Sequence, residues 1–153
     1  RSEYYVGGDC HDGRSDYLQA KISYVASVRK WLNLSISNDY SVSKPYTDGK
    51  ASGDVYRTFM NVSSFTFWLG KQLNVVPSVQ YYHNNYFSSG RNNVFLNTVM
   101  EYYWGNATLS LKCTNLLDSR TFHRIIDNGI TRYSGEYQLR GRTILFGIRI
   151  KII

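Results

Sequence analysis

Apolar and polar residues alternate with a period of two along most of this chain. Near the C-terminus one set of alternate positions is wholly apolar, and it consists of Ile144, Phe146, Ile148, Ile150 and Ile152. In a helix these residues would mix with their neighbours around the cylinder, whereas in a strand they lie on one face. The pattern therefore predicts a β-strand that runs almost to the last residue.

The same alternation recurs in the segments 18–28, 32–42, 73–84 and 108–114. Two further segments, 59–69 and 94–104, alternate less cleanly, because Val62, Phe95 and Val99 lie on the nominally polar side. We therefore predict an all-β fold, an antiparallel up-and-down meander of seven strands, in which residues 4–6 contribute the end of an eighth.

The connections between these strands alternate in length. Short connections lie at 29–31, 70–72 and 105–106, and long polar ones lie at 7–14, 44–54, 86–92 and 118–134. This layout is typical of an up-and-down membrane barrel, which has tight turns at its periplasmic end and longer loops at its extracellular end.

The short connections also predict the strand register. Each is expected to pair apolar residues with apolar residues, because a slip of one position would mix the two faces. The predicted pairs are Val28 with Leu32, Tyr24 with Ile36, Phe67 with Val75, Tyr102 with Leu109, and Glu101 with Ser110.

Alternation alone leaves open whether the apolar side packs against protein or against lipid. A soluble sandwich turns its apolar faces inward, and a membrane barrel turns them outward. The polar side is rich in Ser, Thr, Asn and Gln, and aromatic residues gather near the strand ends, which favours a barrel. A lumen would then be faced by Lys21, Asp39, Gln80, Asn97, Glu101, Lys112, Arg149 and Lys151. A soluble β-sandwich or a lipocalin-like binding module is the alternative, with the aromatics as core or ligand platform.

Composition agrees with strands. Aromatic residues make up 16 % of the 153 residues, only two residues are proline, and the charged fraction of 19 % is below the usual value of about 25 %. The net charge of +7 is scattered along the chain, so we expect no nucleic-acid partner. No apolar run approaches the roughly 18 residues that a membrane-spanning helix needs.

No group of residues predicts catalysis, and we expect neither an enzyme nor a bound cofactor. Asp9, Cys10, His11 and Asp12 have the character of metal ligands, but four adjacent residues cannot all face one ion, so no metal site is predicted. His83 and His123 are expected to be solvated loop residues. Cys10 and Cys113 are expected to be unpaired thiols. Glu101 and Lys112 are candidates for an ion pair or for ligand contacts inside the lumen.

Two segments near the C-terminus, together with the strand start at Trp31, Leu32, Asn33 and Leu34, carry a family resemblance that covers nearly the whole chain. Asn115, Leu116, Leu117 and Asp118 resemble the N-L-x-D motif that closes the penultimate strand of the TonB-dependent outer-membrane receptors. Tyr137, Leu139, Arg140 and Arg142 resemble the Y-x-L-R-P-R stretch that leads into the final strand, especially in the large barrels of Bacteroidetes-type bacteria. Gly141 stands where the family usually has proline, and Ile153 stands where it usually ends in an aromatic residue.

The resemblance implies that residues 1–153 are the C-terminal wall segment of a transmembrane β-barrel in the bacterial outer membrane. It further implies the import of a bulky nutrient, such as a glycan, a peptide or a metal chelate, with a plug domain and TonB acting through parts outside this chain. The implied partners are outer-membrane lipid and a surface lipoprotein.

A small closed outer-membrane barrel with a structural or adhesion role is the other membrane alternative. Closure of so few strands would crowd more positive than negative charge into a narrow lumen, which is costly. We therefore expect an open, curved sheet whose first and last strands do not pair with each other.

Overall fold

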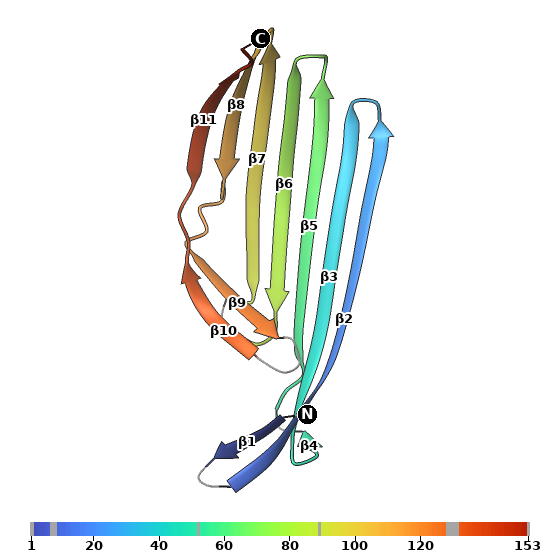
Figure 1. Ribbon diagram of the computed structural model, residues 1–153, viewed down its shortest axis with the longest axis vertical. Coiled ribbons are helices and arrows are strands. Elements are labelled where there is room, and N and C mark those ends of the chain that lie inside the picture. Colours follow the sequence, from blue (N-terminus) through green and yellow to red (C-terminus); the bar gives the residue numbers. More distant parts are fainter. Residues whose placement is uncertain (1, 7–8, 52, 89, 128–131, 153) are drawn as a thin grey trace.

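The computed structural model contains one large antiparallel β-sheet and a separate two-stranded sheet (Figure 1). It describes residues 2–6, 9–51, 53–88, 90–127 and 132–152, and the side chains of these residues except those of 2–11, 125–127 and 132. Strands make up 77 % of the chain, and no helix occurs in the described part, so the predicted all-β class is confirmed. The described residues accordingly include no helix that is long and apolar enough to cross a membrane.

The large sheet is an up-and-down meander, as predicted. Its strands, in order across the sheet, are β1 (Ser2–Val6), β2 (Asp9–Arg29), β3 (Leu32–Thr47), β5 (Tyr56–Leu69), β6 (Leu73–Asn84), β7 (Asn92–Trp104), β8 (Ala107–Thr114) and β11 (Thr143–Ile150), with the short β4 (Lys50–Ala51) paired to β3. The β1–β2 end and β11 lie at opposite edges and do not pair with each other (Figure 1). The expected open sheet is therefore confirmed, with eight strands along this path.

Most of the predicted register is confirmed. Tyr102 pairs with Leu109, Phe67 with Val75, Tyr24 with Ile36, and Glu101 with Ser110. The predicted pairing of Val28 with Leu32 is wrong. Arg29 pairs with Leu32, and Val28 lies in a bulge that absorbs one residue and leaves the register of the rest of the hairpin unchanged.

Three of the predicted long loops contain strands. Strand β2 already begins at Asp9, and β3 continues to Thr47 before turning through Asp48 and Gly49 into β4. Both turn residues have positive φ, +50° and +76°, as a tight hairpin turn with right-handed strand twist requires. The third correction concerns 118–134, which contains β9 (Thr121–Asp127) and the start of β10 (Arg132–Gln138), paired as a hairpin.

The ladder places side chains of the large sheet on two faces, which we call the apolar face and the polar face. The apolar face carries the predicted set, since Phe146 pairs with Leu111 and Ile148 with Leu109, and β3 contributes Leu32 and Leu34. No second layer covers this face within the described residues. Tyr82, on the polar face, and Cys113, on the apolar face, are the only buried hydrophobic residues among the described side chains, so the sheet has no ordinary protein core.

Cys113 is buried and unpaired, as expected. The side chain of Cys10 lies outside the described residues, so that half of the prediction stays a prediction.

Candidate functional site

The β9–β10 hairpin lies near the ends of β6 and β7 (Figure 1), and its aromatic contacts place it on the polar face of the sheet. Phe122 of β9 packs edge-on against Tyr82 of β6 and Phe95 of β7, with ring centroids 5.3 Å and 5.5 Å apart. Tyr137 of β10 also contacts Phe122, at 6.5 Å between centroids. These aromatic contacts dock the hairpin on the sheet, and they explain why Tyr82 is buried although it lies on the polar face.

His123, the next residue of β9, adds a second contact. Its ring packs against Phe87 at 5.3 Å, and its Nε2 atom lies 3.3 Å from a carboxylate oxygen of Glu136 on β10. Gly90 passes so close that a side chain there would collide with the imidazole ring. The interpretation of His123 as a solvated loop residue is therefore wrong. His83 lies in β6, where its Nδ1 atom is hydrogen-bonded to Asn92 at 2.7 Å.

Phe122 lines two grooves on the polar face. One groove, of about 280 Å³, has Tyr17, Tyr82 and Phe122 in its lining, together with Gln19, Asp39 and Arg124. The other, of about 400 Å³, lies towards β8 and is lined by Phe95, Leu139 and Phe122, together with Asn97, Thr114 and Arg140. Aromatic rings beside amides and charged groups provide stacking surfaces and directional hydrogen bonds for a polar organic ligand.

A polar cluster at the base of the hairpin, formed by 115–120 and 140–143, fixes its position, and we call this cluster the latch. Asn115 is its centre. Its Nδ2 atom donates to the carbonyl oxygens of Ser119 at 2.8 Å and Arg140 at 3.1 Å, and its Oδ1 atom accepts from the Ser119 N–H at 2.9 Å. The residue is buried and has a φ of +52°, a conformation that asparagine tolerates better than most residues.

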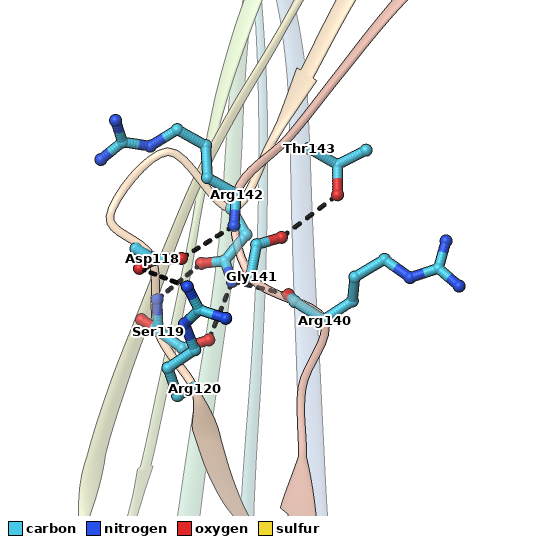
Figure 2. Close-up of polar contacts among 8 residues, drawn as sticks. Asp118, Ser119, Arg120, Arg140, Gly141, Arg142 and Thr143 are labelled. Atoms are coloured by element: carbon cyan, nitrogen blue, oxygen red, sulfur yellow. Dashed lines mark hydrogen bonds and ion pairs between the residues drawn. The ribbon is translucent and has the colours of Figure 1, made fainter.

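Asp118 joins the two chain segments of the latch. Its Oδ1 atom accepts a hydrogen bond from the Arg142 N–H at 2.9 Å, and its Oδ2 atom pairs with the Arg120 guanidinium at 2.9 Å (Figure 2). The Arg142 N–H, followed by the Arg120 side chain, holds the pKa of Asp118 below its ordinary value. The side chains of Arg140 and Arg142 extend away from this carboxylate (Figure 2).

The latch also gives a physical reason for the glycine at 141. A Cβ atom there would lie 2.5 Å from the Cζ atom of Arg120 and 2.7 Å from the Oδ1 atom of Asp118. A side chain would therefore displace the ion pair that closes the latch.

Three hydrogen bonds tie the latch to the sheet. The Ser119 hydroxyl donates to the carbonyl oxygen of Val94 at 3.2 Å. The Asn115 N–H donates to Oδ1 of Asn97 at 2.9 Å, and the Leu116 N–H donates to the carbonyl oxygen of Leu96 at 2.8 Å. The two motif segments found in the sequence thus meet in space. Tyr137 itself belongs to β10, and the stretch then leads into the final strand, which begins at Thr143.

Seven of the eight residues predicted to face a lumen share the polar face, and Lys151 follows the end of β11; the seven are Lys21, Asp39, Gln80, Asn97, Glu101, Lys112 and Arg149. The expected ion pair between Glu101 and Lys112 does not form within the described residues. Glu101 instead accepts a hydrogen bond from the Tyr103 hydroxyl at 3.0 Å.

The docking role of Phe122 was not predicted from the sequence. The available signal was the presence of Tyr82 and Phe95 on an otherwise polar face, because large aromatic side chains there favour a covering partner. Among the described side chains, no group of three His, Cys, Asp or Glu could hold a metal ion. Asp9, Cys10 and His11 fall outside those side chains.

Comparisons with protein-family models, with curated proteins and with solved structures found no match to this chain.

Proposed function

We propose that this chain is part of the wall of a transmembrane β-barrel in a bacterial outer membrane, and that the barrel imports a bulky nutrient in the manner of a TonB-dependent receptor. Its apolar face contacts lipid, and its polar face lines the transport path. The motifs centred on Asn115 and on Arg140 support the likeness to this class of receptor.

The observation that carries the proposal is the uncovered apolar face. Ile144, Phe146, Ile148 and Ile150 are each 60 to 66 % exposed, although all four point to the same side of β11. Leaving such side chains in water costs about 1 to 2 kcal/mol each, so these four alone cost roughly 5 kcal/mol. That is comparable to the whole stability of an ordinary domain, about 5 to 15 kcal/mol. Lipid removes this cost.

The length of the apolar stretch fits a bilayer. On β5 it extends from Phe59 to Leu69, with the polar Asn61 and Ser63 between the apolar residues, over about ten residue steps, or roughly 34 Å along the strand. At a tilt of about 40° this spans about 26 Å along the barrel axis, close to the apolar band of about 25 Å in outer-membrane barrels. Within this stretch the side chains of Asn38 and Asn61 are hydrogen-bonded to each other at 2.7 Å, which satisfies part of their hydrogen-bonding capacity.

The hairpin gives the polar face its proposed role. Docked through Phe122 and held by the latch, it narrows the space above β5, β6 and β7 and forms the two grooves. A ligand crossing the barrel passes beside these grooves.

The two alternatives fit less well. A soluble sandwich needs a second sheet against the apolar face, and the described residues provide none. A small closed barrel needs hydrogen bonds between the two edges of the sheet, whereas the strands β2 and β11 at those edges do not pair with each other within the described residues.

The lipid assignment is tested with a matched pair of spin labels on one strand. Ile148→Cys and Leu145→Cys place the label on the apolar and the polar face of β11, at positions 60 % and 56 % exposed. Both variants are made with Cys10 and Cys113 replaced by serine, in the complete protein reconstituted into bilayers. We expect oxygen to relax the label at 148 more strongly than a water-soluble nickel chelate does, and the reverse at 145. Equal access of the nickel chelate to both labels would contradict the proposal.

Transport is tested in the source cells with a set of glycans, peptides and metal chelates. Deletion of the gene and inactivation of TonB, each made separately, should abolish uptake of the same compound. A compound whose uptake depends on the gene but not on TonB would contradict the assigned energy source.

A further inference from the structure

The groove that is lined by Tyr17, Tyr82 and Phe122 carries opposite charges on two of its sides. Asp39 belongs to β3 of the sheet, and Arg124 belongs to β9 of the hairpin. In the part of the chain that the structure describes, they make no ion pair with each other or with another residue. The carboxylate of Asp39 instead accepts hydrogen bonds from the Gln19 amide, at 2.9 Å and 3.0 Å. Both charges can therefore pair with charged groups of a ligand.

The charged residues nearby do not neutralise this arrangement. Lys21 lies opposite Asp39 in the ladder, but it does not line the groove and makes no ion pair with a described residue. On the hairpin, Arg124 lies opposite Gly135. Glu136, the one hairpin carboxylate whose side chain is described, lies on the other side of the hairpin and pairs with His123. The groove thus keeps one negative and one positive position.

The floor of the groove next to Asp39 is apolar. Asp39, Met60 and Tyr82 form one row across β3, β5 and β6, and the Phe122 ring lies 5.3 Å from the Tyr82 ring. Two strand spacings separate the ends of this row, which is roughly 10 Å. A thioether beside two aromatic rings favours contact with an apolar or aromatic side chain of a ligand.

Polar groups beside this row can bind a peptide backbone. Gln80 makes one weak contact, from its Nε2 atom to the Met60 sulfur atom at 3.7 Å, so its carbonyl oxygen can accept a hydrogen bond from a ligand. The hydroxyl groups of Ser41 and Thr58 are hydrogen-bonded to each other at 2.6 Å and keep further acceptor positions. Each peptide unit offers one donor and one acceptor, which amides and hydroxyls can match.

We propose that this groove recognises a peptide, whose N-terminal ammonium group pairs with Asp39 and whose carboxylate about three residues further on pairs with Arg124. This inference rests on the proposed import function and names the class of nutrient. Three extended residues span about 10 Å, the length of the row from Asp39 to Tyr82. The groove volume of about 280 Å³ lies at the lower end of the range for ligand sites, about 300 to 1,000 Å³, so it suits a segment of this size.

The two charges favour a peptide over the other nutrients. A neutral glycan supplies no counter-ion to Asp39 or to Arg124. An anionic metal chelate is attracted to Arg124 but is repelled by Asp39. A peptide with both termini charged matches both positions.

The test measures binding of the tripeptide alanyl-phenylalanyl-alanine to the complete protein in detergent, by titration with saturation-transfer NMR. N-acetylation and C-terminal amidation of the tripeptide each remove one charge, and each should weaken binding to the unmodified protein about tenfold, because hydrogen bonds between charged groups contribute on that order.

Two variants assign each charge to its partner. Asp39→Asn should weaken binding of the free tripeptide about tenfold and make binding insensitive to acetylation. Arg124→Gln should have the same effect and make binding insensitive to amidation. Lys21→Gln is the matched control, since it removes a neighbouring charge that does not line the groove, and it should change the affinity less than about twofold.

The opposite results have distinct meanings. Absence of tripeptide binding, capped tripeptides that bind as tightly as the free one, or variants that remain sensitive to both caps overturn this inference alone. Tighter binding of the neutral trisaccharide maltotriose, weakened by Asp39→Asn, overturns it in favour of a glycan. Failure of the proposed membrane function appears separately, as equal access of the nickel chelate to the labels at 148 and 145.

Discussion

Replacing Asn115 by alanine tests whether the latch holds the hairpin against the sheet. The substitution removes three hydrogen bonds, to the Ser119 N–H and to the carbonyl oxygens of Ser119 and Arg140. At about 1 kcal/mol each they contribute about 3 kcal/mol. Alanine at a φ of +52° costs about 1 kcal/mol more. Water entering the opened site offsets part of this, so we expect the latched state to lose about 3 kcal/mol.

Hydrogen exchange of two backbone amides reports this change. The Arg142 N–H donates to Asp118 and the Leu139 N–H donates to the carbonyl oxygen of Arg120, so neither loses its own acceptor in the variant. Both become exchangeable only when the latch opens, and 3 kcal/mol corresponds to an acceleration on the order of a hundredfold. Asn106→Ala, in the exposed turn between β7 and β8, serves as the control. Exchange that rises less than about threefold at both amides would refute the role of Asn115.

Three further changes test the hairpin and the latch. Phe122→Ala removes the edge-on contacts with Tyr82 and Phe95 and should weaken docking by about 2 kcal/mol, seen as faster thiol labelling at Gln80→Cys beneath the hairpin; unchanged labelling would contradict the docking role. The folded-state pKa of Asp118 is lowered, so the contribution of its carboxylate to the stability of the latch is complete above the ordinary pKa of 3.8 and is lost as the pH falls through the lowered folded-state pKa. The NMR shift of the Arg142 N–H should follow this titration, and Asp118→Asn should abolish it. Gly141→Ala should displace the Arg120 ion pair and lower the melting temperature by several degrees, whereas Gly53→Ala, whose Cβ meets nothing closer than 3.4 Å, should not.

The strand register was predictable because the physical constraint is local. Gly105 and Asn106 form a two-residue turn, and a slip of one position would carry Leu109 and Leu111 to the polar face. The bulge at Val28 was not predictable, because a two-residue turn followed by a one-residue bulge brings the same apolar residues into pairs as a three-residue turn does.

The β9–β10 hairpin was not predictable, because it depends on contacts between residues that are far apart in the sequence. Thr121–Asp127 shows no clean alternation, since its stability comes from contacts with distant residues such as Tyr82 and Phe95. The sequence singled out residues that the structure places in the latch. Their geometry was not, because Asn115 acts through carbonyl groups of Ser119 and Arg140, which leave no trace in side-chain patterns.

The hairpin separates two strands that pair as though they were consecutive. Strand β11 pairs with β8 over eight residue pairs, although about 28 residues intervene where the other neighbours are joined by two to eight. Bringing the ends of such a long connection together costs about 2 kcal/mol more entropy than closing a two-residue turn. The hydrogen bonds of Asn115 and Asp118 join the two ends of this connection and offset a cost of that size. The latch thus shortens the effective loop, so that β11 can add to the sheet almost as readily as a strand that follows a tight turn.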